Sequence, residues 1–403
     1  MAWYSGIRRG QWHALIAAQL GWMLVAMDVL LYSFALTAIR AEFRLSSTAA
    51  GMLAAAPLVT SAVGGALFGY LCDRFGRVRP LMWAILTFSV FTALAATSRS
   101  PAELVFWRAL VGFGLGGEWA AGAVLVAETW PAEHRAKAVG LMQSGWAIGY
   151  IAAAVLAALV LPAWGWRALF VLGVLPALFT LWIRRRVAEP DVWTRRAPAP
   201  GGMRSLFRPP LVRSLALAAS LCSCVLFAYW GLFTWIPAYL STPVEQGGAG
   251  LSIVRSSAWM VPMQIGAFFG FTLFGFFADR VGRRPAFVAF VLASALLVPA
   301  YGLWGRNAAV LLALGPLVGF FGCGYFSVFG VMLAELFPSA VRATGQGFCY
   351  NVGRALSALA PVTVGALADR HGIGAALGVT SVFFAGGAAL MLLLPETRGE
   401  ELR

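Results

Sequence analysis

Long apolar runs, each of about 20 residues and nearly free of charge, follow one another through most of the chain. At about 1.5 Å per helical residue, such a run crosses the roughly 30 Å hydrocarbon core of a bilayer. Of the 403 residues, 60% are hydrophobic and only 11% are charged, whereas an average soluble domain has about 25% charged residues. We therefore expect an all-α polytopic membrane protein in contact with the lipid bilayer, and the composition excludes a disordered chain.

The order of the apolar runs predicts twelve membrane-spanning helices. Their expected ranges are 14–36, 49–72, 81–97, 103–129, 136–161, 166–183, 214–240, 254–278, 285–304, 308–334, 343–367 and 373–394. Basic residues collect in cytoplasmic loops, and most of the 30 lysines and arginines fall on one side if the N-terminus is inside. We therefore expect both termini in the cytoplasm and the chain in the inner membrane of a bacterium. The net charge of +14 reflects this bias, and the charges are too sparse for a nucleic-acid partner.

Two charged motifs recur at a nearly constant spacing. A Gly-x-x-x-Asp-Arg-x-Gly-Arg motif contains Asp73 and returns with Asp279, and a Glu-x-x-Pro motif begins at Glu128 and returns at Glu335. The same spacing relates Gly165 to Gly372 and Glu189 to Glu396. Chance does not hold one spacing across so many residues, so the chain is an internal duplication.

The duplication predicts a six-helix bundle at 1–183, a second six-helix bundle at 214–403, and a cytoplasmic linker at 184–213 between them. The linker is rich in arginine, proline and glycine, as expected of a loop outside the membrane. Repeats of this kind place a substrate site between the halves, near the middle of the membrane.

The repeated loop motif resembles the signature of the major facilitator superfamily, and the resemblance covers the whole chain. Within the superfamily the chain is most similar to the sialate:proton symporter branch, which includes carriers of small organic acids. The stretches that carry this similarity are 108–119, 128–135, 165–170, 229–235 and 347–354. The resemblance implies two helical bundles that rock around a central cavity and expose it to each side in turn. We expect a monomer with protons as the coupling ion, without another cofactor or a metal.

The resemblance also implies a gate at the cytoplasmic ends of the two bundles. One half of the gate would comprise Asp73, Arg77, Glu128 and Arg135, and the other Asp279, Arg283, Glu335 and Arg342. Bonds among these charges would hold the gate shut and break when the cavity opens inward. The alternative is that the arginines only mark the cytoplasmic side, but topology alone does not explain aspartate and glycine repeated at one spacing.

Four ionisable residues fall inside predicted spans, where each is costly and is by default a candidate for function. Asp28 and Arg108 are expected at the same depth, so that they can pair within the first bundle, as in the proton-coupled sugar porters that the chain resembles. Protonation of Asp28 would then release Arg108, although a static ion pair is the alternative. Glu118 is either a second proton site or a protonated group hydrogen-bonded inside the bundle.

Arg354 is the fourth of these residues, and its planar guanidinium suits a carboxylate. Asn351, three residues earlier, is expected on the same face of the helix. Further candidates for binding the substrate are Tyr229, Tyr350, Gln264 and Trp119, within a larger set of aromatic and amide residues that includes Gln143, Trp146, Tyr150 and Trp230. The alternative is that Arg354 pairs with a carboxylate of the protein, and Glu118 is the credible partner.

The function favoured by these residues is proton-coupled symport of a small organic anion, such as a monocarboxylate or a related organic acid. One rival is a drug or organic-cation:proton antiporter, which the arginine at mid-membrane disfavours. A sugar-like proton symporter is another. A receptor that senses a nutrient without moving it is disfavoured by the short tail after the last span. An enzyme is not expected, because the sequence shows no nucleotide loop, metal-ligand set or nucleophile–base pair.

Overall fold

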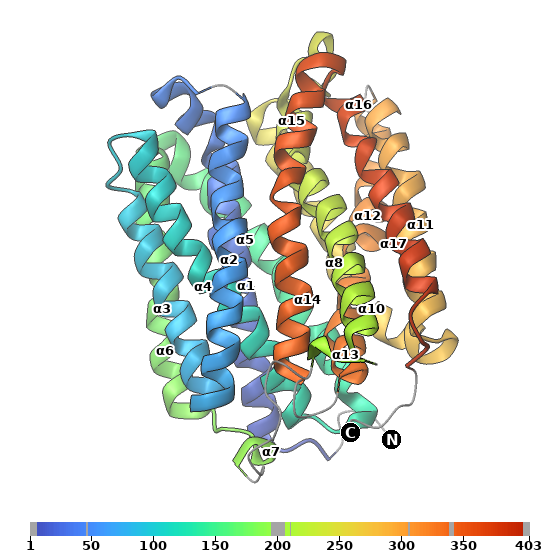
Figure 1. Ribbon diagram of the computed structural model, residues 1–403. Coiled ribbons are helices and arrows are strands. Elements are labelled where there is room, and N and C mark those ends of the chain that lie inside the picture. The colour runs from blue at the N-terminus through green and yellow to red at the C-terminus, as the bar shows by residue number, and fades with distance from the viewer. Residues whose placement is uncertain are drawn as a thin grey trace.

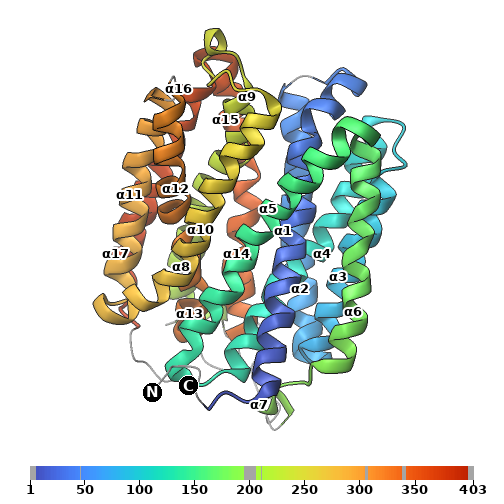
Figure 2. The same ribbon diagram turned by 180° about the vertical axis from the view of Figure 1, so that it is seen from behind.

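The computed structural model describes residues 6–45, 47–194, 206–209, 211–304, 307–337 and 342–397. Within these residues the regular structure is helical, and the helices stand side by side in two groups (Figure 1). Helices of the first part of the chain form one group, and helices of the last part form the other. The view from behind shows the same division (Figure 2).

The first bundle is built around a set of long helices. They are α1 (Arg9–Phe43), α2 (Ser47–Phe75), α3 (Val78–Ala95), α4 (Pro101–Thr129), α5 (Ala132–Val171), the short 3₁₀ helix η1 (Leu172–Val174) and α6 (Leu175–Arg186), followed by α7 (Asp191–Thr194). Helix α1 packs against α5, and α2 packs against α4. The second of these contacts is close because Gly116 lies against the Ser61 carbonyl, where a Cβ would have no room.

The second bundle contains more helix breaks. Its helices are α8 (Leu211–Phe233), α9 (Ile236–Ser241), the 3₁₀ helix η3 (Val244–Gln246), α10 (Ile253–Val281), α11 (Arg283–Trp304), α12 (Ala308–Gly324), α13 (Phe326–Leu336), α14 (Arg342–Ser357), α15 (Leu359–His371), α16 (Ile373–Leu377) and α17 (Val379–Leu392). Helix α10 packs against α12, and α8 packs against α14.

The twelve expected spans can be followed in these helices. Within the described ranges, ten helical segments have the length and apolarity of a membrane span. One of them, Lys137–Arg186, has 50 residues and contains two expected spans, because the chain turns at Gly165, whose φ of 71° lies outside helical values. The expected span at 343–367 is missing from the ten, since α14 is polar for a membrane helix and carries Arg354.

Three prolines of the second bundle lie in or beside its helices. We expect kinks at Pro237, Pro262 and Pro316, since proline removes a backbone donor. Pro237 does follow a break, between α8 and α9. Pro262 and Pro316 lie inside the continuous helices α10 and α12, so a kink there would bend the helix without ending it.

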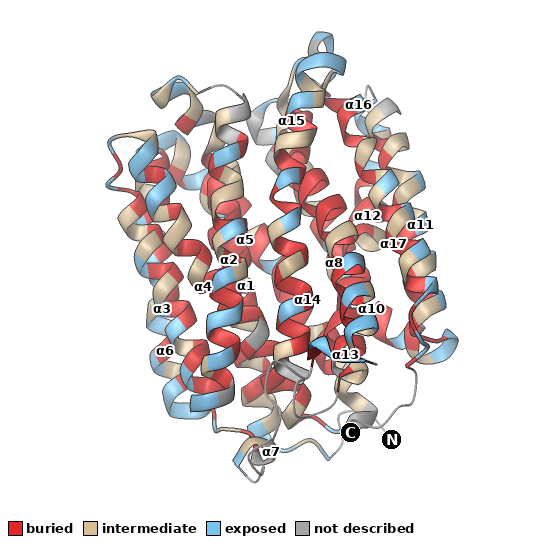
Figure 3. Ribbon diagram, in the orientation of Figure 1, coloured by how far each residue is buried: buried red, intermediate tan, exposed pale blue. Residues whose placement is uncertain are grey.

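The two bundles meet along helices α2 and α5 of the first bundle, each of which packs against two helices of the second. Helix α2 of the first bundle packs against α14 and α15, and α5 packs against α10 and α13. Helix α1 begins and α17 ends at the same end of the molecule (Figure 1), which we call the terminal face. Buried residues concentrate on the facing sides of the helices, whereas exposed residues lie on the outer sides (Figure 3). The packed interior therefore lies between the bundles, where a site shared by both would be placed.

Candidate functional site

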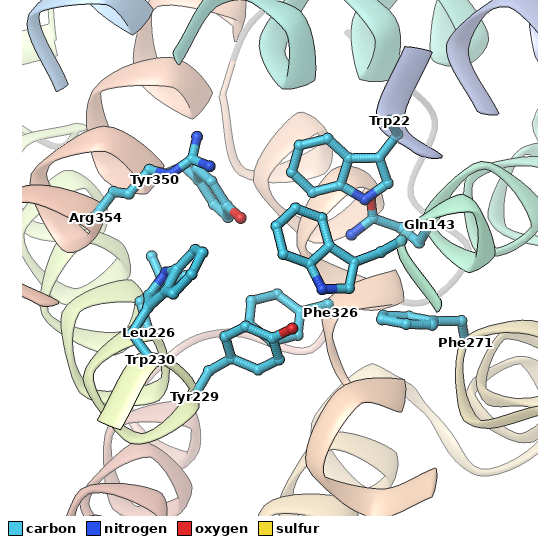
Figure 4. A pocket seen from close by; sticks show the side chains of 10 residues that line it. Trp22, Gln143, Leu226, Tyr229, Trp230, Phe271, Phe326, Tyr350 and Arg354 are labelled. Atoms are coloured by element: carbon cyan, nitrogen blue, oxygen red, sulfur yellow. The ribbon is translucent and has the colours of Figure 1, made fainter. Parts of the chain in front are cut away.

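A narrow pocket lies between the two bundles, with a cavity volume of about 20 Å³, which is room for about one water molecule. It is lined by Trp22, Gln143 and Trp146 of the first bundle and by Leu226, Tyr229, Trp230, Phe271, Phe326, Tyr350 and Arg354 of the second (Figure 4). Its wall is mostly aromatic. Arg354 is the one charged residue among those that line it in the described part of the chain.

Arg354 also holds the bundles together. Its Nη1 donates to the Leu115 carbonyl of α4, at 3.3 Å. One turn away along both helices, the ring of Tyr350 stacks on the ring of Trp119, with centroids 3.9 Å apart and planes at 14°. We call these two contacts the α4–α14 clamp. All four residues are buried, so the clamp joins the two halves of the molecule beside the pocket.

Glu118 lies next to this clamp on α4. Its carboxylate is fully buried and has no hydrogen-bond partner among the described residues. It lies against Gly21 of α1, where a Cβ would collide with Oε1. It also interacts electrostatically with Arg354, but the two form no direct ion pair. Glu118 is therefore a charge partner of Arg354 at a distance, across the boundary between the bundles.

Asp28 and Arg108 lie near each other in the first bundle, as the sequence predicts. Both are buried and interact electrostatically. The two form no direct ion pair, however, because neither carboxylate oxygen of Asp28 has a well-formed hydrogen bond among the described residues, and the polar side chain beside it is that of Thr92. Instead, the Arg108 guanidinium lies over the Tyr32 ring, 4.7 Å from its centroid. Depth along a helix predicted the proximity, but it does not fix the direction of the side chains.

The predicted substrate residues divide into two groups. Tyr229, Tyr350 and Arg354 line the pocket, and Trp119 supports it from behind through its stack with Tyr350. Asn351 is turned away, because its amide donates to the Gly347 carbonyl and its side chain packs against Gly65 of α2. Gln264 is also outside the pocket lining, although its buried amide has no partner among the described residues.

The sequence analysis missed four lining residues, Trp22, Leu226, Phe271 and Phe326. No polar residue marks them, and an entirely apolar span has no amphipathic period to show which face turns inward. Trp22 is the one tryptophan of the expected span 14–36, and a single aromatic residue is a weak signal because most aromatic residues in spans face lipid or core.

The gate residues form ion pairs within each bundle at the terminal face. The Arg77 guanidinium binds Glu128 through two bonds, Nη2 to Oε1 at 2.8 Å and Nε to Oε2 at 3.0 Å. In the second bundle, Arg283 Nη1 binds Asp279 Oδ1 at 2.6 Å. The side chains of two other members of the gate, Asp73 and Arg342, lie outside the described residues.

One pair in this set acts between the bundles. Arg135, which donates Nε to the Ala127 carbonyl at 2.9 Å, interacts electrostatically with Glu335 of the other bundle. Burial lowers the pKa of the Arg135 guanidinium, and the Glu335 carboxylate opposes that change. Beside it, the Lys137 ammonium lies over the Phe276 ring, 5.3 Å from the centroid. The bundles therefore attract each other at the terminal face.

Two glutamates that the sequence analysis matched without assigning a role cap helices in this region. Glu189 accepts hydrogen bonds from the backbone N–H groups of Arg77 and Val78 at the start of α3. Glu396 accepts from the N–H groups of Arg283 and Arg284 at the start of α11, at 2.8 and 3.0 Å. A carboxylate at a helix N-terminus is favourable because it meets free N–H groups and the positive end of the helix dipole. Each of these glutamates follows the last long helix of its bundle, so each cap joins that segment to the repeated loop motif.

Replacing Gly76 by alanine should disrupt the first of these caps. Gly76 has a φ of +100°, and a Cβ there would collide with the Glu189 carboxylate. The strained backbone alone costs about 1–3 kcal/mol, so we expect a clear loss of thermal stability in detergent. Gly69→Ala is the matched control, because a Cβ at Gly69 meets nothing within 4 Å. Equal unfolding temperatures for the two variants would show that this cap does not stabilise the loop.

Comparison with known proteins agrees with this architecture. The chain matches the Major Facilitator Superfamily over residues 20–271 and 250–403. It is 38% identical over 408 residues to a protein of Cupriavidus pinatubonensis named "Probable 4-methylmuconolactone transporter", with 99% of this chain and 94% of that protein covered. It is 29% identical over 396 residues to the sialic acid transporter NanX of Escherichia coli, with 98% and 95% covered.

A solved structure shows the same fold. The proton:xylose symporter XylE of E. coli matches with a TM-score of 0.77 at 20% identity, over 98% of each chain. These relatives are transporters rather than enzymes, as the sequence predicts for this chain. The similarity to a sialic acid transporter also agrees with the branch suggested by the motifs. With its two helical bundles and its match over nearly the whole length, the chain belongs to the major facilitator superfamily of membrane transporters.

Proposed function

We propose that the protein is a proton-coupled symporter of a small organic anion, such as a monocarboxylate or a related organic acid. The observation that carries this proposal is the position of Arg354 in the pocket. Its guanidinium forms no ion pair with a carboxylate of the described chain and uses one N–H on a backbone carbonyl. The lining residues include no acidic side chain, so the pocket favours an anion over the organic cation that an antiporter would carry.

The relatives support the same chemistry. Sialic acid is a carboxylic acid, and 4-methylmuconolactone, for which the Cupriavidus relative is named, is a compound of the same class. A transporter of uncharged sugars is less consistent with the site, because a buried arginine facing a neutral ligand would have no closer countercharge than Glu118, which forms no direct ion pair with it.

The α4–α14 clamp provides a way for the anion to change the conformation. A carboxylate would bind the N–H groups of Arg354 that the Leu115 carbonyl leaves free. By drawing the guanidinium toward the pocket, the anion would weaken the contact with Leu115 and leave the stack of Trp119 on Tyr350. The anion has the differential interaction with the two states that a ligand needs to shift a conformational equilibrium.

Protons would couple to this cycle through the buried carboxyl groups. Asp28 lies within the electrostatic range of Arg108, and Glu118 lies within that of Arg354. Protonation of either carboxyl removes a charge that attracts the arginine. Asp28 acts within one bundle and is the first candidate for the coupling site. Glu118 acts across the bundles and is the second.

The terminal face would be cytoplasmic. Arginines at the end of α6, at the start of α3 and at the start of α11 all lie on this face, which is the bias that sets orientation in bacterial membranes. The orientation has a consequence for the mechanism, since it makes the gate residues the barrier that opens toward the cell interior.

Uptake into proteoliposomes tests the proposed function. Purified protein is reconstituted, a pH gradient with an alkaline interior is imposed, and accumulation of a labelled carboxylate such as nicotinate, benzoate or muconate is followed. We expect accumulation that stops when an ionophore collapses the gradient. Accumulation of amines but not carboxylates would instead support the cation antiporter, and no gradient-dependent transport of any of them would reject the proposal.

Removing charges at the gate should slow the cycle while leaving binding intact. In Asp279→Asn and Glu335→Gln, the ion pair with Arg283 and the attraction for Arg135 are weakened at the terminal face, remote from the pocket. We expect transport to fall several-fold while the affinity for the substrate changes less than twofold, as measured by uptake and by binding to the same preparation. Asp369→Asn is the control, because Asp369 lies near the end of α15, which is away from the terminal face (Figure 1). The gate has no role if both variants transport at the rate of the control.

A further inference from the structure

Three tryptophans that line the pocket have indole N–H groups without a hydrogen-bond acceptor. Trp22 of α1, Trp146 of α5 and Trp230 of α8 are 3%, 4% and 7% exposed. None of their Nε1 atoms has a partner with good hydrogen-bond geometry among the described residues, and the nearest approach is that of Trp146 to the Tyr229 hydroxyl. The ring of Trp146 lies 4.7 Å from that of Trp22 and 6.0 Å from that of Trp230, measured between centroids. We call the three residues the indole triad.

Buried tryptophans elsewhere in the described chain are satisfied. Their Nε1 atoms donate to Gln143 Oε1 from Trp119, to the Gln11 carbonyl from Trp130, to Glu42 from Trp166 and to the Pro361 carbonyl from Trp235. An indole N–H is a donor only, and a buried donor without an acceptor carries the cost of its lost hydration. Among the fully buried tryptophans of the described chain, those without a well-formed hydrogen bond all line the pocket, which indicates that their acceptor comes from the pocket's contents.

The triad is distinct from the carboxylate contact at Arg354. Trp22 lies across the pocket from Arg354, whereas Trp230 lies on the same side (Figure 4). Trp22 and Trp146 belong to the first bundle, whereas Trp230 belongs to the second. A ligand held by Arg354 alone would leave these N–H groups without acceptors, but a ligand with a second acceptor could reach at least one of them.

We propose that the indole triad is an acceptor subsite, and that the substrate is a carboxylate carrying a second hydrogen-bond acceptor, such as a ring nitrogen, a carbonyl or another carboxylate oxygen. This inference rests on the proposed function, because it takes Arg354 as the ligand of the first carboxylate. Purely apolar monocarboxylates are poor ligands of such a site. The aromatic rings of the triad also fit a flat or unsaturated skeleton between the two polar ends.

Two pairs of probe compounds isolate the second acceptor. Nicotinate and benzoate differ by one ring nitrogen, and trans,trans-muconate and sorbate differ by a carboxylate in place of a methyl group. Binding is measured by isothermal titration of the purified full chain in detergent. In at least one pair we expect the acceptor-bearing compound to bind about tenfold more tightly, the effect of one or two net hydrogen bonds.

Variants then assign the preference to the triad. Replacing Trp22, Trp146 or Trp230 by benzothienylalanine exchanges the N–H for sulfur and keeps the shape of the side chain, and Trp→Phe is the simpler variant. We expect at least one of the three positions to lose several-fold affinity for the acceptor-bearing compound, with its partner compound unchanged. Trp164→Phe is the control, since Trp164 is 71% exposed.

The outcomes distinguish a failure of the acceptor subsite from a failure of the proposed anion transport. If both compounds of each pair bind equally, or if the variants weaken both members alike, the acceptor subsite is wrong, while anion transport stands. If neither member of either pair binds, and uptake of carboxylates is also absent, the proposed function fails and takes the subsite with it.

Discussion

Replacing Arg354 by alanine should reduce the affinity for the substrate by about 10- to 100-fold, because a charge-assisted hydrogen bond contributes about 1.5–3 kcal/mol. The variant removes the charged group of the pocket lining and leaves the aromatic wall intact. Arg354→Lys retains the charge without the planar fork, so we expect a loss of intermediate size. Binding of the labelled carboxylate to purified protein gives the measurement.

Two controls keep this result interpretable. Arg255→Ala removes an exposed arginine at the start of α10, far from the pocket, and should bind as the wild type does. Unfolding temperatures show whether Arg354→Ala still folds, which we expect because the side chain satisfies no protein carboxylate directly. Near-native affinity in a folded Arg354→Ala variant would remove the anion site from this pocket and reopen the sugar-like and cationic alternatives.

Replacing Asp28 by asparagine should abolish uptake driven by a pH gradient, with a loss of more than tenfold, while exchange of substrate across the membrane continues. Asparagine has the shape of aspartate but no proton to give or take, so the charge state of the cluster with Arg108 and Tyr32 no longer responds to pH. Uptake and counterflow in the same proteoliposomes separate the two activities. Glu118→Gln is the comparison, and unchanged gradient-driven uptake in Asp28→Asn would move the coupling site to Glu118.

The architecture could be predicted from the sequence because two independent signals agree. Apolar runs define the spans, and the repeated loop motifs define the two halves. The buried positions of Asp28, Arg108, Glu118 and Arg354 also follow, since an ionisable residue in a span avoids lipid. Each of these inferences depends on spacing along the chain, which a helix converts directly into depth.

The details of the site depend on how each helix is rotated about its own axis, because this rotation decides which residues face the pocket. The sequence of an apolar span does not reveal that rotation. Asn351 was expected beside Arg354 but faces α2 instead, because three residues rotate a helix by less than a full turn. The partner of Arg354 on α4 is the Leu115 carbonyl, and a backbone group leaves no trace in the sequence. Trp22 and Phe271 line the pocket. The sequence does not reveal this, because neighbouring residues in the same spans are also apolar.

The central claim is that the pocket recognises a negative charge, and matched ligands test it most directly. The unfolding temperature of the purified protein is measured with nicotinate, benzoate or muconate, and then with the amide and methyl ester of each acid. A ligand at 100 times its dissociation constant stabilises the folded state by about 2.7 kcal/mol. We predict this stabilisation for at least one carboxylate and none for its amide or ester, whereas equal stabilisation by an uncharged analogue would contradict the account.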